Sequence, residues 1–244
     1  MSSPRPELLV APCEHAAAEY AVKKWHYSKR MPTPPIIRFG VWEAGVFIGC
    51  ILFSRGANNN MLKPYGLTVT EGCELARVAL RKHAAPVSQI VSNAIRLLAF
   101  GNPGLRLVVS YADPRVGHVG SIYQAMNWVY TGRGGDDIRL LLPNGNLLHS
   151  RQFSVNGYRT QYGERRKVPT HGDGEIIKVP GKHRYLYPLD RAMRRQIAPL
   201  AQPYPKRESC GPSVEGDTSG VQPEGAGSIP AARSLGGDTS HDGA

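Results

Sequence analysis

The sequence predicts an α/β (α+β) fold in which helices flank a mixed, twisted β-sheet, and three observations support this prediction. Residues 74–80 and 105–111 are short apolar runs of the kind that form buried strands. Residues 87–101, between them, repeat apolar side chains at spacings of three and four, which is typical of a helix packed on one side. Residues 36–42 and 46–54 are two further apolar runs joined by Glu-Ala-Gly, which indicates a hairpin.

The remaining elements follow from capping and turn residues. Residues 14–25 read as a first helix, and the basic loop after it contains three prolines that cannot continue a helix. Ser121 is a candidate cap for a helix through Tyr130 that Gly132 closes. The Asn-Gly pair at 144–145 predicts a hairpin, and residues 184–197 predict a strand followed by a short basic helix.

The longest predicted helix has the clearest pattern, and it gives a list of expected core residues. These are Val87, Ile90, Val91, Ala94 and Leu98. Polar residues between them cover the opposite side, so we expect one face of this helix to pack on the sheet.

Charge divides the chain into a basic body and an acidic tail. Residues 208–244 carry a net charge of −5 within a chain of +11, so the remainder carries +16. We expect 1–202 to form the catalytic domain, with a basic C-terminal portion. Residues 203–244, rich in Gly, Ser, Asp and Glu, are expected to be disordered because they lack apolar side chains. A basic body attracts polyanions such as nucleic acid, although a basic enzyme without such a partner fits equally.

Several classes of protein are disfavoured by what the chain lacks. Its four cysteines are scattered without a Cys-x-x-Cys pair, which argues against a zinc ribbon and a disulfide scaffold. No apolar stretch resembles a signal peptide or reaches the ~18 residues of a membrane span. A cytoplasmic protein without a membrane partner is therefore expected, and its oligomeric state is not predicted.

The order of elements matches the N-acetyltransferase (GNAT-like) layout of a mixed sheet flanked by helices. In that layout the strands corresponding to 74–80 and 105–111 splay apart, and a cofactor enters the gap. Ligands of open α/β sheets bind beyond the carboxyl ends of strands, where this chain places its unusual polar residues. We therefore expect an active-site cleft there.

Five segments together resemble the Mom family of bacteriophage DNA-modification proteins. They are WHYSKRMP at 25–32, ELARVAL at 74–80, SYADP at 110–114, GHVGSIYQAMNWVYTG at 117–132 and KHRYLYPLDRAMR at 182–194. The resemblance covers roughly residues 10–195 and does not extend to the acidic tail.

The resemblance implies a phage-encoded enzyme, acting in the bacterial cytoplasm, that converts adenine in double-stranded DNA to N6-carbamoylmethyladenine. This modification shields the DNA from restriction enzymes. The resemblance also implies a set of catalytic positions: His26, Tyr27, Arg77, Ser88, Asp113 and Tyr123.

The chemistry of these residues allows catalytic roles and also ordinary structural ones. His26 titrates near neutrality, and Asp113 projects from a strand end, so each can accept a proton, although Asp113 before proline is also typical of an Asx-turn. Arg77 lies within an apolar strand, where alternation places it on one face with Leu75 and Ala79. It is costly there unless it pairs with an acid or faces a ligand. Tyr123 can stack on a base or be a core tyrosine.

Basic residues interleaved with tyrosines indicate contact with the DNA backbone, since residues 151–207 carry a net charge of +9. The candidate DNA-binding residues are Lys29, Arg30, Arg151, Arg159, Arg165, Arg166, Lys167, Lys182 and Arg184.

The donor of the transferred group is not identified by the sequence, and two kinds of cofactor are considered. Arg81 and Lys82 lie in the loop where many acetyltransferases bind the pyrophosphate of acyl-CoA, and Gly117 and Gly120 allow close approach to an anion. Neither segment has the usual glycine-rich signature. Acyl transfer would leave an N6-acyl group, whereas carbamoylmethyl is joined through a saturated carbon, so iron held by His26 and Asp113, with Tyr27 and Tyr123, is the second possibility.

Two other function classes compete with DNA modification. An acyl-CoA N-acyltransferase acting on a protein or small amine would cleave a thioester without DNA. A non-catalytic DNA-binding protein would bind DNA with steep salt dependence and leave its nucleosides unchanged.

Overall fold

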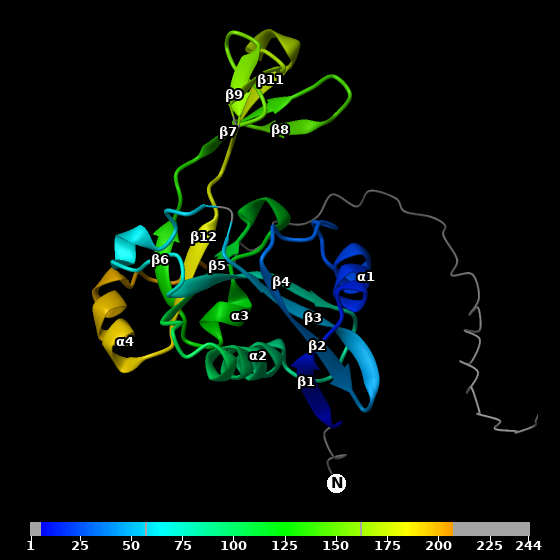
Figure 1. Cartoon of the computed structure of the whole chain (residues 1–244), viewed down its shortest axis with the longest axis vertical. Coiled ribbons are helices and arrows are strands. Elements are labelled where there is room, and N and C mark those ends of the chain that lie inside the picture. Colours follow the sequence, from blue (N-terminus) through cyan, green and yellow to red (C-terminus); the bar gives the residue numbers. More distant parts are fainter. Residues whose placement is uncertain (1–5, 57, 162, 207–244) are drawn as a thin grey trace, which may run out of the picture. The chain divides into compact units, whose positions relative to one another are not determined.

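The computed structural model describes residues 6–56, 58–161 and 163–206. Its main element is a seven-stranded sheet of order β1-β2-β3-β4-β5-β12-β6 (Figure 1). These strands are β1 (Leu8–Pro12), β2 (Ile36–Glu43), β3 (Val46–Ser54), β4 (Gly72–Leu80), β5 (Leu107–Ala112), β6 (Val129–Arg133) and β12 (His183–Pro188). All neighbours are antiparallel except β4 and β5, which are parallel. The predicted mixed sheet is confirmed.

Helices cover both faces of this sheet, as the alternation of side chains along β3 shows. Ile51 and Phe53 pack in a cluster with α2 (Val87–Gly101), whereas Cys50 and Leu52 pack with α1 (His15–Trp25) on the other face. The short α3 (Ser121–Gln124) adds Tyr123 to the α2 cluster, and α4 (Arg191–Ile197) packs in a third cluster against β5 and β12.

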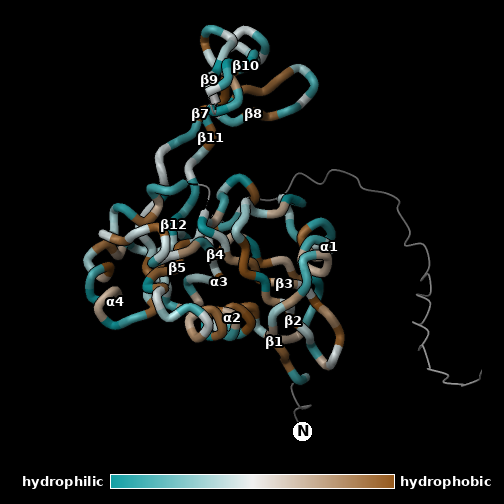
Figure 2. The backbone as a smooth tube through the Cα atoms, viewed as in Figure 1, coloured by the Kyte–Doolittle hydropathy of each residue, from teal (hydrophilic) through white to brown (hydrophobic). Residues whose placement is uncertain are grey.

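The α2 helix agrees closely with its predicted pattern. Ile90, Val91, Ala94 and Leu98 are fully buried, and Val87 is partly buried against the same cluster. Figure 2 shows the corresponding apolar stretch in α2 beneath the equally apolar β3. Burial of this face stabilises the fold through the hydrophobic effect.

The parallel strands β4 and β5 pair only where they begin. Gly72–Glu74 pair with Leu107–Val109, and the two strands do not pair beyond these three residues of each. The separation expected between these two strands is therefore present. It leaves the second half of β4 facing open space instead of a neighbouring strand on that side.

Strict alternation through residues 74–80 was a wrong prediction. Leu52 and Phe53 of β3 lie opposite Arg77 and Leu75, so Ala76 is an extra residue, a β-bulge. The bulge reverses the alternation after it: Leu75 joins the α2 cluster, whereas Ala79 joins the α1 cluster on the other face. Period-two patterns cannot reveal such an inserted residue.

The helix predicted from Ser121 to Tyr130 was also wrong. The helical segment α3 ends at Gln124, and Asn127 then adopts a left-handed backbone conformation with φ of 55°. This lets the Trp128 N–H donate to the Tyr123 carbonyl oxygen at 3.0 Å, and β6 begins at the next residue. Asparagine tolerates that conformation, and the Val-Tyr-Thr run after it favours a strand.

Residues between β6 and β12 form an inserted lobe with its own two sheets. One sheet has the order β11-β7-β8 and the other pairs β9 with β10. The strands are β7 (Asp137–Leu141), β8 (Leu147–His149), β9 (Tyr158–Gln161), β10 (Glu164–Lys167) and β11 (Glu175–Val179). The Asn144-Gly145 hairpin is confirmed, because it joins β7 to β8 with Gly145 at φ of 80°.

The beginning of the predicted tail packs against the main sheet. The Tyr204 hydroxyl donates to the Trp128 carbonyl oxygen at 2.8 Å, and Gln124 donates to the Pro205 carbonyl oxygen. The rest of the predicted acidic tail, from residue 207, lies outside the described residues. Among the helices that are described, none is long and apolar enough to cross a membrane.

Candidate active site

A cleft of about 450 Å³ lies where β4 and β5 separate. Its size falls in the range of small-molecule sites. Four of the six predicted catalytic residues, His26, Tyr27, Arg77 and Tyr123, line it. Other lining residues are Trp25, Glu74, Leu75, Ala76, Val78, Val87, Tyr111, Ala112, Gly117, His118, Val119, Gly120, Ser121, Ile122 and Lys182.

His26 follows the last residue of α1 and is buried at the cleft wall. The Ser28 backbone N–H donates to its Nδ1 at 3.1 Å, so Nδ1 is an acceptor and the ring carries its proton on Nε2. Burial, with the nearby Arg77 charge second, lowers the pKa of His26 to about 4. His26 is therefore a neutral hydrogen-bond donor at physiological pH.

Tyr27 provides an accessible aromatic surface at the same cleft. Its side chain is 49% exposed, and its ring lies 4.4 Å from that of His26 and 5.4 Å from that of His118. Burial, with the Asp113 charge second, raises the pKa of Tyr27, so the phenol stays protonated. An exposed ring of this kind can stack on a planar base.

Arg77 connects the middle of β4 to the loop that carries His26 and Tyr27. Its Nε donates to the Arg30 carbonyl oxygen at 3.0 Å, and its Nη1 donates to the Ala76 carbonyl oxygen at 2.6 Å. Arg77 forms no ion pair with any residue that the structure describes. Of the two predicted alternatives for Arg77, a structural salt bridge is thus not observed.

Glu74 is a cleft residue that the sequence did not single out. Burial raises the pKa of its carboxyl group, and the charges of Lys182 and Arg77 only partly oppose this effect. The same carboxylate helps to raise the pKa of Tyr27, Tyr111 and Tyr123, which places it among the three phenols. One signal was available: an acid within an apolar strand is as anomalous as Arg77.

Tyr111 and Tyr123 form the inner wall of the cleft. Burial, ahead of all other effects, raises the pKa of each to about 12. The Ser110 hydroxyl lies within donating distance of two acceptors, the Leu75 carbonyl oxygen at 2.8 Å and the Tyr123 hydroxyl oxygen at 2.7 Å. Tyr123 is only 7% exposed, and this packing favours its structural alternative.

Asp113 is fully buried behind the cleft wall and is absent from the lining residues. Burial alone would raise the pKa of Asp113, but side-chain and backbone hydrogen bonds from Arg115 outweigh it and hold the pKa below its usual range. The Arg115 guanidinium contacts both carboxylate oxygens, and the Arg115 N–H completes an Asx-turn before a short 3₁₀ turn. With these contacts, Asp113 is better suited to hold the Gly117–Gly120 segment in place than to accept a proton.

The predicted cofactor residues divide into two groups. Gly117 and Gly120 line the cleft with left-handed backbones, at φ of 70° and 77°. A side chain at Gly120 would collide with the Tyr185 ring, so the close approach there is to protein. Arg81 and Lys82 are exposed on the loop between β4 and α2 and do not line the cleft.

The backbone amides that follow Arg81 and Lys82 already donate hydrogen bonds to an anionic side chain. The Ala84 and Ala85 N–H groups donate to the Glu43 carboxylate at 2.7 to 3.1 Å. These hydrogen bonds lower the pKa of Glu43. A pyrophosphate would have to displace that carboxylate to use the same donors. Ser88, one turn further along α2, is half-buried and does not line the cleft.

The residues present do not fit the predicted iron site. Within the described residues there is no group of three or more His, Cys, Asp or Glu side chains able to hold a metal ion. His26 Nδ1 is committed to Ser28, and both Asp113 oxygens are committed to Arg115.

The predicted DNA-binding residues occupy three places. Lys29 and Arg30 are exposed on the loop beside the cleft, and Lys182 lines it. The inserted lobe carries five others: Arg151, Arg159, Arg165, Arg166 and Lys167. Arg184 is elsewhere, half-buried on β12, with its Nε donating to the Thr131 hydroxyl at 2.9 Å.

These features define an α/β protein with a polar cleft between separated parallel strands, containing a carboxyl group of raised pKa and an accessible aromatic wall. The sequence of residues 7–206 matches the Mom protein family, and the chain belongs to that family. A relative is the methylcarbamoylase mom of Escherichia phage Mu, 25% identical over 198 residues that cover 78% of this chain and 80% of the relative.

Solved structures similar to this chain include two acetyltransferases of low sequence identity. An acetyltransferase of Thermus thermophilus is 14% identical, with a TM-score of 0.40 over 75% of this chain and 97% of that one. The spermidine/spermine N-acetyltransferase of Vibrio cholerae is 11% identical, with a TM-score of 0.41 over 77% and 96%.

Proposed function

We propose that this protein is a phage-encoded enzyme that converts adenine in DNA to N6-carbamoylmethyladenine and so protects the DNA from host restriction. Membership of the Mom family and the similarity to a methylcarbamoylase support the class of reaction. The observation that carries the proposal is the arrangement in the cleft. A carboxyl group of raised pKa, Glu74, shares it with the exposed ring of Tyr27 and the neutral donor His26.

The target base must leave the duplex to reach such a cleft, at a cost of roughly a few kcal/mol. Tyr27 stacks on the extruded purine, since its ring is exposed at the cleft and backed by His26. His26 donates its Nε2–H to a ring nitrogen of the base. These contacts orient the N6 amine towards the interior of the cleft.

Glu74 then acts as the proton acceptor. The N6 lone pair is delocalised into the ring, so proton removal must accompany attack. The donor in this proposal is an activated carbamoylmethyl compound with a leaving group on its methylene carbon. The N6–carbon bond forms, the bond from that carbon to the leaving group breaks, and the leaving group departs with its electron pair. Glu74 takes the N6 proton.

Arg77 and Asp113 are positioning residues in this proposal. Arg77 fixes the loop of His26 and Tyr27 through the Arg30 carbonyl, and Asp113 fixes the segment that follows β5 through Arg115. Rigid support of this kind matters because small displacements of reacting groups cost much of the rate.

Mass spectrometry of nucleosides tests the proposal directly. DNA from bacteria expressing the chain is digested to nucleosides, and a deoxyadenosine carrying a carbamoylmethyl group is sought. The Glu74→Gln variant should remove this nucleoside, and Glu14→Gln, at an exposed acid on another part of the fold, should retain it. Unmodified DNA together with thioester cleavage would instead support an acyltransferase, and unmodified DNA with tight DNA binding would support a binding protein.

A further inference from the structure

We propose that one face of the β9–β10 ribbon is the duplex-DNA docking element of this protein, and that the opposite face is not. The inference rests on the proposed function for the identity of the polyanion. It separates the basic residues of the lobe into a DNA-binding set and a structural set.

The register of the ribbon assigns its side chains to two faces. Thr160 pairs with Arg165 and Tyr158 pairs with Lys167, so these four side chains share one side, the Arg165 face. The residues between them point to the other side, the Arg166 face, which carries Arg159, Arg166 and Glu164.

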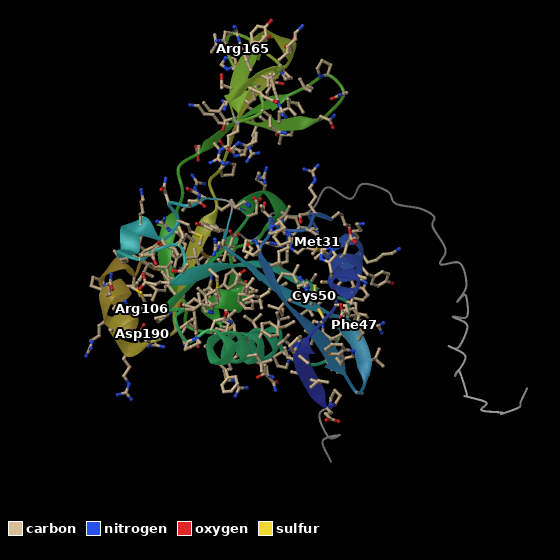
Figure 3. The ribbon with its side chains drawn as sticks, viewed as in Figure 1. Met31, Phe47, Cys50, Arg106, Arg165 and Asp190 are labelled. Atoms are coloured by element: carbon tan, nitrogen blue, oxygen red, sulfur yellow. The ribbon has the colours of Figure 1, made fainter. Side chains whose placement is uncertain are left out.

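On the Arg165 face both cations are available. Arg165 and Lys167 are exposed, and neither forms an ion pair with another residue in the described part of the chain. The Arg165 guanidinium lies 4.2 Å from the centre of the exposed Tyr158 ring, which orders its side chain without neutralising it. Figure 3 labels Arg165 on this lobe, and Figure 2 shows the hydrophilic character of β9 and β10.

On the Arg166 face both cations are already engaged. Arg159 donates from Nε to the Phe153 carbonyl oxygen at 3.0 Å and also to the Ser150 carbonyl oxygen, so it clamps the ribbon to its own lobe. Arg166 pairs with Glu164 at 2.8 Å. A phosphate approaching this face meets a carboxylate, which repels it.

The shape of the ribbon suits the major groove of B-form DNA. A two-stranded ribbon fits a groove about 12 Å wide, and strands of four residues span about 13 Å at their usual rise. Arginine, lysine, threonine and tyrosine are side chains that bind phosphates and base edges. The lobe is also close to the cleft along the chain, because β11 ends three residues before Lys182, and Lys182 lines the cleft.

Two adjacent arginines give a matched test. Arg165→Ala and Arg166→Ala remove the same charge from neighbouring exposed positions of one strand. Binding of the full chain to a labelled DNA duplex is measured by fluorescence anisotropy between 50 and 200 mM salt, a range over which phosphate contacts are strongly screened. We expect Arg165→Ala to weaken binding about fivefold or more and to reduce the salt slope by about 1, with Arg166→Ala near wild type.

A second pair of variants controls for local misfolding of the ribbon. Lys167→Ala should weaken binding in the same way, whereas Lys178→Ala, at an exposed lysine of β11, should not. Equal losses in Arg165→Ala and Arg166→Ala, or no loss in either, would overturn the proposal. Equal weakening by Arg165→Ala on a duplex RNA of the same sequence would also overturn it, since the major groove of A-form RNA does not admit a ribbon.

Nucleoside analysis of the same variants separates this inference from the proposed function. If the wild-type chain modifies adenine but the matched variants bind alike, only the ribbon assignment fails. If the wild-type chain binds duplex DNA through Arg165 but leaves its adenines unchanged, the proposed reaction fails and the ribbon assignment stands.

Discussion

The Nε of Arg77 donates a hydrogen bond to the carbonyl oxygen of Arg30 at 3.0 Å, joining residues 47 positions apart in the chain. This bond holds the loop after α1 against β4, at the point where β4 has no β5 partner. The wall of the cleft formed by His26 and Tyr27 therefore depends on a guanidinium that contacts backbone and not an acid.

Arg77→Lys should loosen this loop and lower the rate of adenine modification by about tenfold to a hundredfold. A single ammonium cannot reproduce both bonds of the planar guanidinium, from Nε to Arg30 and from Nη1 to Ala76. Hydrogen exchange of the Lys29 amide, which donates to the His26 carbonyl oxygen, reports on the loop without substrate.

Arg96→Lys, at an exposed position of α2, is the control for this substitution and should change neither quantity. A large rate loss in Arg77→Lys with unchanged exchange of the Lys29 amide would mean that Arg77 acts on the substrate directly and does not serve to hold the loop.

Glu74→Gln should reduce the rate of modification by a factor of about a hundred or more while the fold is kept. General acid–base groups typically contribute factors of this size, and the amide has nearly the shape of the carboxyl group. Wild-type activity should rise with pH as Glu74 loses its proton, with a midpoint above the ordinary 4.5 because burial raises this pKa. A pH profile without that limb, or an active Glu74→Gln enzyme, would exclude Glu74 as the base.

The raised pKa of Glu74 also predicts a pH dependence of stability. A carboxyl group whose pKa is higher in the folded state than in the unfolded state stabilises the fold when it is protonated. This contribution is fully present below the unfolded pKa and is lost as pH rises through the folded pKa. Glu74→Gln lacks the buried charge, so its melting temperature relative to wild type should increase from pH 4 to pH 8. Differential scanning calorimetry at the two pH values measures this; a constant difference contradicts it.

Much of this architecture was readable from residue spacing. The apolar stripe of α2, the β2–β3 hairpin and the unusual Arg77 followed from periodicity and from the cost of a charge in an apolar strand. The bulge at Ala76 and the left-handed Asn127 were not readable, because each is one residue whose conformation depends on partners far away in the chain. Glu74 is a different case: an acid within an apolar strand was a readable signal, but its burial near three phenols depends on the separation of β4 and β5.

Asp113→Asn should lower the free energy of unfolding at neutral pH. It should also remove the part of the acid-pH dependence of stability that arises from this carboxyl group. The depressed pKa of Asp113 gives a stabilisation that is present above its unfolded pKa and lost as pH falls through the lower folded value. The asparagine cannot accept two charge-assisted bonds from Arg115. Thermal unfolding from pH 7 down to pH 3 should show wild type converging on the variant, and parallel curves would disprove the assignment.

Acetyl-CoA should not bind this protein, because the Glu43 carboxylate already accepts hydrogen bonds from the backbone amides that precede α2. Its carboxylate accepts from Ala84 and Ala85, so a pyrophosphate there would meet a negative charge instead of free donors. A ligand at 100 times its Kd stabilises a protein by about 2.7 kcal/mol, so binding would be visible as a raised melting temperature. We expect no rise at millimolar acetyl-CoA and a lower melting temperature in Glu43→Ala, whose two amides lose their acceptor. A clear rise for the wild-type chain would return acyl-CoA to consideration as the donor and would require Glu43 to move when it binds.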